Sequence, residues 1–522
     1  MVRSRRWLLA FALFGFAVCN FGFWKYHRYY TDDAYISLRY CYNLIHGNGL
    51  VWNPGERVEG YSNFLFVILE SICSRLGIGF VFASRLLGVI SFITLISFLV
   101  RYGSRRIKTE EINWVPAYLP AFLVGTSFCI IVWSLGGLET ALFSLLVTAG
   151  ALFAFEGLSG SVRQSVISGT LLGFATLTRP DGALILAVVS LFYLWSVLRK
   201  RTNAPICLVG LLSPYALLVG THVIWRYSYY GYLLPNTWYV KGIFSWERAW
   251  LGLLYFVSFC FDQPFLLPLL VVALLTLAAL RTWDTQLSFI GAVVLAYSVG
   301  IASAGGDHML GFRPIVGIIP LIALMTGLAF ERLTEKFGHV FLPIAGTLVS
   351  LLIVPQVLFP GRGLQGAEAP DGAAFCGLAV GEYINEHWPK GSLIALNSAG
   401  ATPFYAPQHR FIDMLGLNDT TIAHRSPVPM ILPYQIVPGH AKGDGKYIFD
   451  RKPDYIIAGP SNGCDIYHAR TLSEYELARI FEFKDTYILR RAQIPVSQYD
   501  QYQLFSDTKS GQMTFTYYER VR

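Results

Sequence analysis

Long apolar runs recur along the first 358 residues of this chain, and they decide what it can fold into. A membrane-spanning helix needs about 20 mostly apolar residues. Runs of this kind fall near residues 7–24, 81–100, 114–133, 139–156, 165–178, 182–198, 205–225, 252–280, 286–303, 314–330 and 338–358. The pattern predicts an all-α polytopic membrane domain over residues 1–358, with about eleven spans of this length. The run 252–280 is long enough to break at Pro264 or Pro268.

Composition agrees with this class. The chain is 54% hydrophobic and 14% charged, which is more apolar than a soluble globular protein of 522 residues needs. The net charge of +8 is modest, and the basic residues lie in short loops rather than on one helical face. We therefore expect membrane lipids, and no nucleic acid, as partners. The eight cysteines form no CxxC pair and no Cys/His cluster, so no metal ligands are predicted.

Basic residues also predict the orientation. Arg3, Arg5 and Arg6 precede the first apolar run, which is too long and aromatic for a cleaved signal. The positive-inside rule then places the N-terminus in the cytoplasm. Alternation puts basic residues on the same side in the loops 101–113, 157–164, 199–204, 281–285 and 331–337.

The opposite face gathers charged turns. It receives Asp32-Asp33, Gly136–Thr140, Thr178–Gly182, the loop 226–249 and Gly305–His308. Paired acids beside a bilayer are costly and call for a function. Because the orientation was inferred from other residues, this convergence predicts an extracytoplasmic active site.

Residues 359–522 have a different character. The composition shifts at Pro360–Gly363, which reads as a linker, and an odd number of spans places the following region outside. Residues 375–388 have helical spacing, whereas Leu393–Leu396, Tyr455–Ala458 and Tyr487–Leu489 resemble short buried strands. We expect a small extracytoplasmic α/β domain. In that compartment Cys376 and Cys464 would be able to form a disulfide.

Several motifs resemble a known family. The run Asp32–Tyr40, continued by Gly47–Tyr61, resembles the GT-C membrane glycosyltransferases, and among them the branch of the actinobacterial terminal β-arabinofuranosyltransferase. Further matching segments are Gly137–Thr140, Thr178–Gly182, Tyr230–Thr237 with Lys241, Gly305–Asp307, Asp413–Asp419, and Gly439–His440 with Lys442–Gly445. The resemblance covers nearly the whole chain. One departure is His308, which follows Asp307 where an aromatic residue is expected in relatives.

The resemblance implies a GT-C-type transferase in the bacterial inner (cytoplasmic) membrane. Its donor would be a polyprenyl-phosphate-linked sugar, with arabinofuranose as the expected sugar. Its acceptor would be a glycan, a lipid-linked glycan or a protein outside the cytoplasm. One rival is a donor carrying a hexose or an aminosugar. The other is a lipid-linked sugar transporter or flippase, but transporters place charges at the bilayer midplane and often contain inverted repeats. Here the charges gather at one face, and no repeat is visible.

Asp32 and Asp33 are the predicted catalytic residues. A carboxylate within hydrogen-bond reach of an acceptor hydroxyl can take its proton as the phosphate leaves. Successive residues point in different directions, so we expect one of the two to act on the substrate and the other to hold structure or a cation. The structural alternative is that both cap a helix from Ala34 to His46.

Basic side chains are the candidates for the departing lipid phosphate, namely Arg179, Lys241, His308 and Arg313. Snorkelling to the membrane interface is the alternative for each. The candidate substrate-binding residues are Trp52, Glu59, Tyr61 and Asp307. Glu139 and Asp181 are interpreted as ion-pair partners that tie loops together. No cofactor is required, although carboxylates would suit Mg²⁺ or Ca²⁺. The segments 413–419 and 439–445 form either a lid or acceptor surface, or a structural loop.

Overall fold

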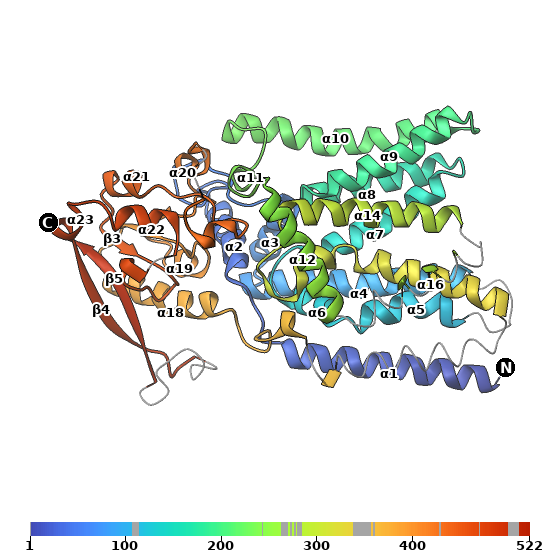
Figure 1. The fold of residues 1–522 in the computed structure, drawn as a ribbon, viewed down its shortest axis with the longest axis horizontal. Helices are drawn as coiled ribbons and strands as arrows, with labels where there is room; N and C mark the ends of the chain where they lie inside the picture. The colour runs from blue at the N-terminus through green and yellow to red at the C-terminus, as the bar shows by residue number, and fades with distance from the viewer. Residues whose placement is uncertain are drawn as a thin grey trace.

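The chain was analysed as a computed structural model, which describes residues 2–106, 114–242, 244–262, 270–271, 274–275, 278, 284–337, 357–358, 361–426, 428, 430–468, 470–499 and 511–521. Figure 1 shows an elongated molecule with the two termini at opposite ends. Roughly parallel helices form the part that contains the N-terminus, and a sheet with short helices forms the part that contains the C-terminus.

The helices of the bundle follow the apolar runs. They are α1 (Val2–Tyr26), α4 (Phe80–Arg106), α5 (Trp114–Gly125), α6 (Phe128–Leu135), α7 (Thr140–Gly157), α8 (Val162–Thr178), α9 (Gly182–Leu198), α10 (Ala204–Tyr230), α14 (Thr285–Ala304), α15 (Arg313–Val316) and α16 (Ile319–Phe337). In the described part of the chain, 5 helices are long and apolar enough to cross a membrane, or up to 7 if each of two bent pairs is one span. The chain is therefore a multi-pass membrane protein. The predicted run 338–358 lies almost entirely outside the described residues.

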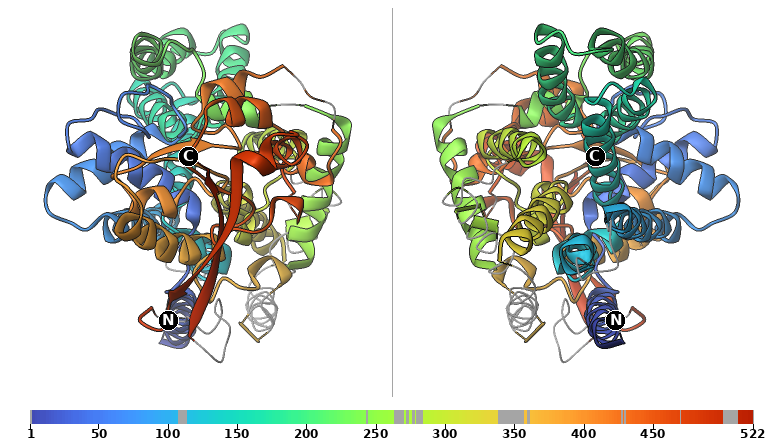
Figure 2. Two further views of the ribbon diagram at one scale, coloured as in Figure 1. Left: turned by 90° about the vertical axis from the view of Figure 1, so that its left-hand side faces the viewer. Right: turned by 90° about the vertical axis from the view of Figure 1, so that its right-hand side faces the viewer.

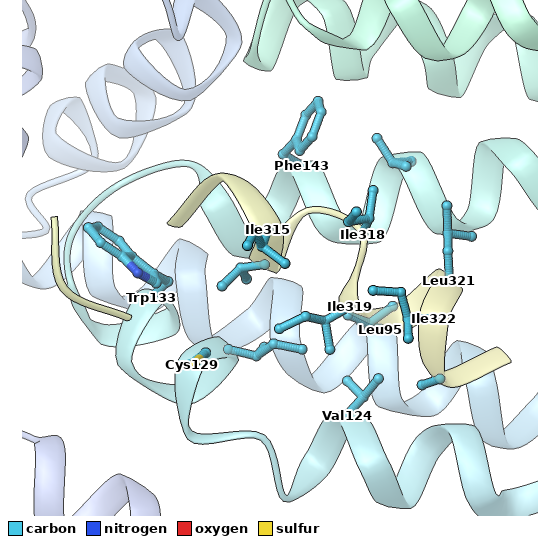
Figure 3. Close-up of a cluster of buried hydrophobic side chains, with 14 of the residues drawn as sticks. Leu95, Val124, Cys129, Trp133, Phe143, Ile315, Ile318, Ile319, Leu321 and Ile322 are labelled. Atoms are coloured by element: carbon cyan, nitrogen blue, oxygen red, sulfur yellow. The ribbon is translucent and has the colours of Figure 1, made fainter. Parts of the chain in front are cut away.

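The two bent pairs build the centre of the bundle. The break between α5 and α6 bends the chain by 55°, and the break before α16 bends it by 66°. Figure 3 shows the side chains that pack there, with Trp133 of α6 and Ile315 of α15 in the same apolar cluster. The Trp133 indole N–H donates to the carbonyl of Leu310 at 3.0 Å. The bends therefore bring Glu139, just after α6, and Arg313, the first residue of α15, to one end of the bundle.

Four shorter helices lie at that end, namely α2 (Asp32–Ile45), α3 (Phe64–Arg75), α11 (Asn236–Lys241) and α12 (Trp246–Asp262). α12 runs across the direction of the bundle helices in both Figure 1 and Figure 2, so it does not begin the predicted span 252–280. Its amphipathic character explains this: Trp246 and Trp250 are exposed, whereas Arg248 is buried. A helix with such faces typically lies in a membrane interface. The predicted breaks at Pro264 and Pro268 fall outside the described residues.

A five-stranded mixed sheet organises the region after residue 360. Its strands are β1 (Leu393–Leu396), β2 (Arg410–Asp413), β3 (Tyr455–Ile457), β4 (Tyr487–Pro495) and β5 (Gln512–Arg520), in the order β2-β1-β3-β5-β4. β1 pairs parallel with β2 and β3, and β5 pairs antiparallel with β3 and β4. The surrounding helices are α18 (Gly372–His387), α19 (Ala401–Tyr405), α20 (Thr420–His424), α21 (Gly445–Asp450), α22 (Leu472–Leu477) and α23 (Phe483–Thr486).

The predicted helix 375–388 and the three predicted strands are confirmed as α18, β1, β3 and the start of β4. Cys376 and Cys464, which the sequence left open as a disulfide pair, are both free thiols. Cys376 is buried on α18, whereas Cys464 lies directly against Gly459 after β3.

Candidate active site

A cavity of about 590 Å³ lies where the bundle meets the C-terminal region. Its wall combines one face of α2, the segment 60–63, the ends of α8 and α14, α11, and two residues of the C-terminal region, Leu417 and Pro438. Asp33, Ile36 and Ser37 line it together because residues three and four apart share a helix face. The volume is within the range of pockets that bind small molecules.

Charged turns from separate parts of the sequence meet in this cavity. Its charged lining residues are Asp33, Glu139, Arg179, Asp181, Lys241, Asp307 and Arg313. Arg179 pairs with Glu139 at 3.2 Å and with Asp181 at 3.0 Å. Tyr297 of α14 donates its hydroxyl to the same Asp181 carboxylate at 2.7 Å. Arg179, Glu139 and Asp181 thus tie α7, α8 and α9 together at the cavity edge, as expected for the two acids.

Asp307 and Arg313 form a second pair, with 2.9 Å between Nε and Oδ2. Burial alone would raise the pKa of Asp307, but the Arg313 guanidinium, with His308 and Lys241 nearby, holds it below its usual value. Asp307 is therefore ionised at neutral pH and offers no base of useful strength. The pair instead leaves a fixed positive guanidinium in the cavity wall, with Trp133 beneath it at 5.7 Å.

Two charged lining residues remain. Within the described part of the chain, the side chains of Asp33 and Lys241 form no ion pair, unlike the other five charged residues of the wall. Asp33 stands in the first turn of α2, and Lys241 is the last residue of α11. The cavity therefore contains one uncommitted carboxylate and one uncommitted ammonium group, which are available to a ligand.

Asp32 has a different position from Asp33 and does not line the cavity. Its carboxylate accepts hydrogen bonds from the backbone N–H groups of Gly400 at 3.2 Å and Ala401 at 2.8 Å. Asp371 in turn accepts from the Asp32 backbone N–H at 3.2 Å. Asp32 thus joins the start of α2 to α19 in the C-terminal region and is a structural residue.

The pKa of Asp32 yields a test of this structural role. Burial raises it to about 7, although the Ala401 N–H opposes the shift. Between about pH 4 and pH 7 the folded protein holds a proton that the unfolded chain has released, so stability falls as the pH rises through this window. We expect Asp32→Asn to remove this component of the pH dependence. Thermal unfolding of both proteins in detergent across this range measures it.

The comparison with wild type isolates Asp32, because the neighbouring carboxylates Asp33 and Asp371 are present in both proteins. Identical slopes of unfolding temperature against pH for wild type and Asp32→Asn would contradict this role.

Two predicted substrate-binding residues lie outside the cavity. Trp52 is 1% exposed and packs against Phe411, with the Arg39 guanidinium 5.4 Å from its ring. Glu59 forms a buried ion pair with Arg226 of α10, with 2.6 Å between Oε2 and Nε. Both side chains are held by partners far away in the sequence: Trp52 packs on β2 of the C-terminal region, whereas Glu59 ties its loop to α10 of the bundle.

Of the remaining predicted site residues, one lines the cavity and the other does not. Tyr61 lines the cavity, and its hydroxyl lies 3.1 Å from that of Tyr230. His308 does not line it: its ring is half-exposed, lies beside Asp307 and meets the ring of His440 edge-on at 5.4 Å. The histidine that departs from the family pattern therefore stands outside the cavity wall.

Sequence reasoning missed the neutral polar wall of the cavity. Ser37 and Asn63 hydrogen-bond each other, and the Asn63 amide also donates to Glu139 at 3.2 Å. Thr237 of α11 also lines the cavity. Ser37 stands four residues after Asp33, so helical spacing was an available signal for it. Among the described residues, no group of three or more His, Cys, Asp and Glu side chains is placed to hold a metal ion.

Comparisons with known proteins were made for the sequence and the fold. A family model described as "Domain of unknown function (DUF8728)" matches residues 366–509. The "Terminal beta-(1->2)-arabinofuranosyltransferase" of Mycobacterium tuberculosis is 28% identical over 396 residues, which are 65% of this chain and 59% of that protein. The enzyme of the same name from Corynebacterium glutamicum is 24% identical over 378 residues, 64% of this chain and 49% of that protein.

The fold has a solved counterpart. ArnT from Cupriavidus metallidurans, in a crystal structure bound to undecaprenyl phosphate, superposes with a TM-score of 0.52 over 80% of this chain and 87% of that chain, at 14% identity. The chain thus spans only about half to three fifths of its two sequence relatives, but most of this structural neighbour. The resemblance inferred from the motifs is confirmed: the chain is similar to terminal arabinofuranosyltransferases and has the fold of ArnT.

Proposed function

We propose that this chain is a membrane glycosyltransferase that moves a sugar, arabinofuranose, from a polyprenyl-phosphate donor to a glycan, lipid-linked glycan or protein acceptor. The observation that carries the proposal is that one cavity contains the Asp33 carboxylate and the Lys241 ammonium group, neither of which has an ion-pair partner among the described residues. The names of the two sequence relatives support the sugar and the reaction. The undecaprenyl phosphate bound in the ArnT crystal structure supports the lipid phosphate.

The reaction needs a base on one side and positive charge on the other. Asp33 would accept the proton of the acceptor hydroxyl while its oxygen forms a bond to the anomeric carbon. The bond between that carbon and the phosphate oxygen breaks, and the phosphate leaves with the electron pair. Lys241 would bind the leaving phosphate directly, and Arg313, already neutralised in part by Asp307, would add the field of its guanidinium.

The topology belongs to the same proposal. We place about eleven spans in residues 1–358, with the N-terminus in the cytoplasm of a bacterial cell and the cavity on the far face of its inner membrane. Residues 359–522 would form the extracytoplasmic α/β domain. The reaction requires no cofactor, since the donor carries a single phosphate. A Mg²⁺ or Ca²⁺ ion at the free Asp33 carboxylate is the alternative way to neutralise that phosphate.

A donor assay tests the function. The full chain in lipid nanodiscs is given synthetic polyprenyl-phosphate arabinofuranose, or the corresponding hexose and aminosugar donors, with a cell-envelope glycan as acceptor. We expect transfer from the arabinofuranose donor, detected as a pentose added to the acceptor by mass spectrometry, and unchanged by EDTA.

Transfer from only the hexose or aminosugar donor would contradict the sugar assignment. Movement of the lipid donor across proteoliposome membranes without any transfer would identify a flippase instead. The gathering of charges at one end of the bundle favours the enzyme over this second class.

A further inference from the structure

The short helix α11 carries three lining residues of the cavity, Thr237, Trp238 and Lys241. It has only 6 residues. Helices shorter than about 12 residues are marginal on their own, so α11 owes its position to its neighbours. The place of Lys241 in the cavity therefore depends on what holds the two ends of this helix.

The first residue of α11 holds the N-terminal end. The side-chain amide of Asn236 lies 2.8 Å from the carbonyl oxygen of Gly416, 3.0 Å from that of Leu417 and 3.3 Å from that of Asp419. Its backbone N–H donates to the carbonyl of Glu59 at 2.9 Å. Asn236 is only 5% exposed, and its two amide hydrogens have carbonyl partners in the C-terminal region.

The loop that receives Asn236 is itself ordered from within. The buried carboxylate of Asp413 accepts hydrogen bonds from the backbone N–H groups of Leu415 at 3.0 Å and Asn418 at 2.8 Å. It also accepts from the Asn418 amide at 3.0 Å. The loop whose carbonyl groups meet Asn236 is thus held by hydrogen bonds that do not involve α11. Leu417 of the same loop lines the cavity.

Arg248 of α12 links the other end of α11 to the C-terminal region. Arg248 donates to the carbonyl of Lys241 and to that of Gln435, both at 3.3 Å. Gly439 lies beside the Lys241 side chain, since a Cβ at this residue would be 3.3 Å from Lys241 Cε. Residues that follow the linker at 360–363 therefore anchor the N-terminal end of α11 directly, and Arg248 of α12 connects its C-terminal end to Gln435 of the same region.

We propose that Asn236 is a positioning residue, through which the loop 413–419 sets Lys241 at the place of the lipid phosphate. The inference rests on the proposed function, in which Lys241 binds that phosphate. The segment 413–419 then acts on the donor site indirectly, by holding α11 in place. The C-terminal region therefore contributes to binding of the donor.

A double-mutant cycle tests the inference with undecaprenyl phosphate as the probe. Its affinity is measured for the full chain in nanodiscs, as wild type, Asn236→Ala, Lys241→Ala and the double variant. We expect each single substitution to weaken binding about tenfold or more. We expect the double variant to bind no more weakly than Lys241→Ala, because both substitutions remove the same contact.

Asn43→Ala is the matched control. Asn43 is also buried, and its amide donates to the carbonyls of Val51 at 2.9 Å and Trp52 at 3.0 Å, away from α11. This variant should lose thermal stability to a similar extent and keep its affinity for undecaprenyl phosphate within about twofold. Should Asn236→Ala fail to fold, Asn236→Ser retains one donor and replaces it in the cycle.

The outcomes separate the two proposals. If Lys241→Ala binds undecaprenyl phosphate with wild-type affinity, Lys241 does not have its proposed role, and the inference about Asn236 fails as well. Normal binding by Asn236→Ala, beside weakened binding by Lys241→Ala, would overturn the inference alone. An equal loss from the Asn236 substitution in the wild-type and Lys241→Ala backgrounds would show that Asn236 does not act through Lys241, and would also overturn it.

Discussion

Replacing Asp33 with asparagine should lower the rate of sugar transfer by about 10²–10⁴-fold, the usual contribution of a general base. Asparagine has the same shape but cannot accept the proton of the acceptor hydroxyl. Asp33 lines the cavity and has no ionic partner among the described residues, so its loss breaks no structural contact of that kind. Transfer from the lipid-linked donor, at saturating donor and acceptor, measures the effect on kcat.

Two further aspartates serve as controls for this prediction. Asp32→Asn changes the neighbouring carboxylate, which faces Gly400 and Ala401, and should retain transfer within about one order of magnitude. Asp450→Asn alters an exposed residue that pairs only with Lys446 across one helical turn, and should have no effect. If Asp33→Asn keeps wild-type kcat, or if Asp32→Asn loses as much, Asp33 is not the base.

Glu59→Ala should lower the free energy of unfolding by about 3–5 kcal/mol, because it leaves the charge of Arg226 buried and unpaired. The side chains of the pair are only 2% and 10% exposed. The loss should appear as a lower thermal unfolding temperature in detergent. The KM values of the folded fraction should stay close to those of wild type, since Glu59 does not line the cavity.

A surface pair in the same loop provides the matched control. Glu56 pairs with Arg410 at 2.8 Å, with side chains 34% and 52% exposed. Glu56→Ala should cost less than about 1 kcal/mol, because water screens an exposed pair. A change in KM for donor or acceptor in Glu59→Ala, without loss of stability, would restore Glu59 as a substrate-binding residue.

The sequence was informative about which turns meet, and much less about where individual side chains point. Hydrophobic runs and basic loops were enough to predict that the turns at 136–140, 178–182 and 305–308 share a face, and residues from all three line one cavity. Side-chain direction within the first loop was not predictable. It depends on partners such as Gly400 for Asp32, more than 360 residues further along the chain.

The same reason explains the other differences. The direction of Trp52 depends on Phe411, and that of Glu59 depends on Arg226, and no local pattern encodes either contact. Hydropathy counts apolar residues but not the direction in which their side chains point. Part of α12 was therefore assigned to a span, although the helix crosses the bundle and its apolar side faces outward. Local pattern did predict β1 and β3, which are short continuous apolar runs, and α18, which has helical spacing.

The anchoring of α11 at both ends has a consequence for protein engineering. Residues 236–248 and 413–439 act as one unit, although nearly two hundred positions separate them in the chain. A chimaera that joins two related transferases at the linker would combine an asparagine from one parent with carbonyl groups from the other. The donor preference of one parent should therefore pass to the chimaera only when residues 236–248 and 413–439 are exchanged together.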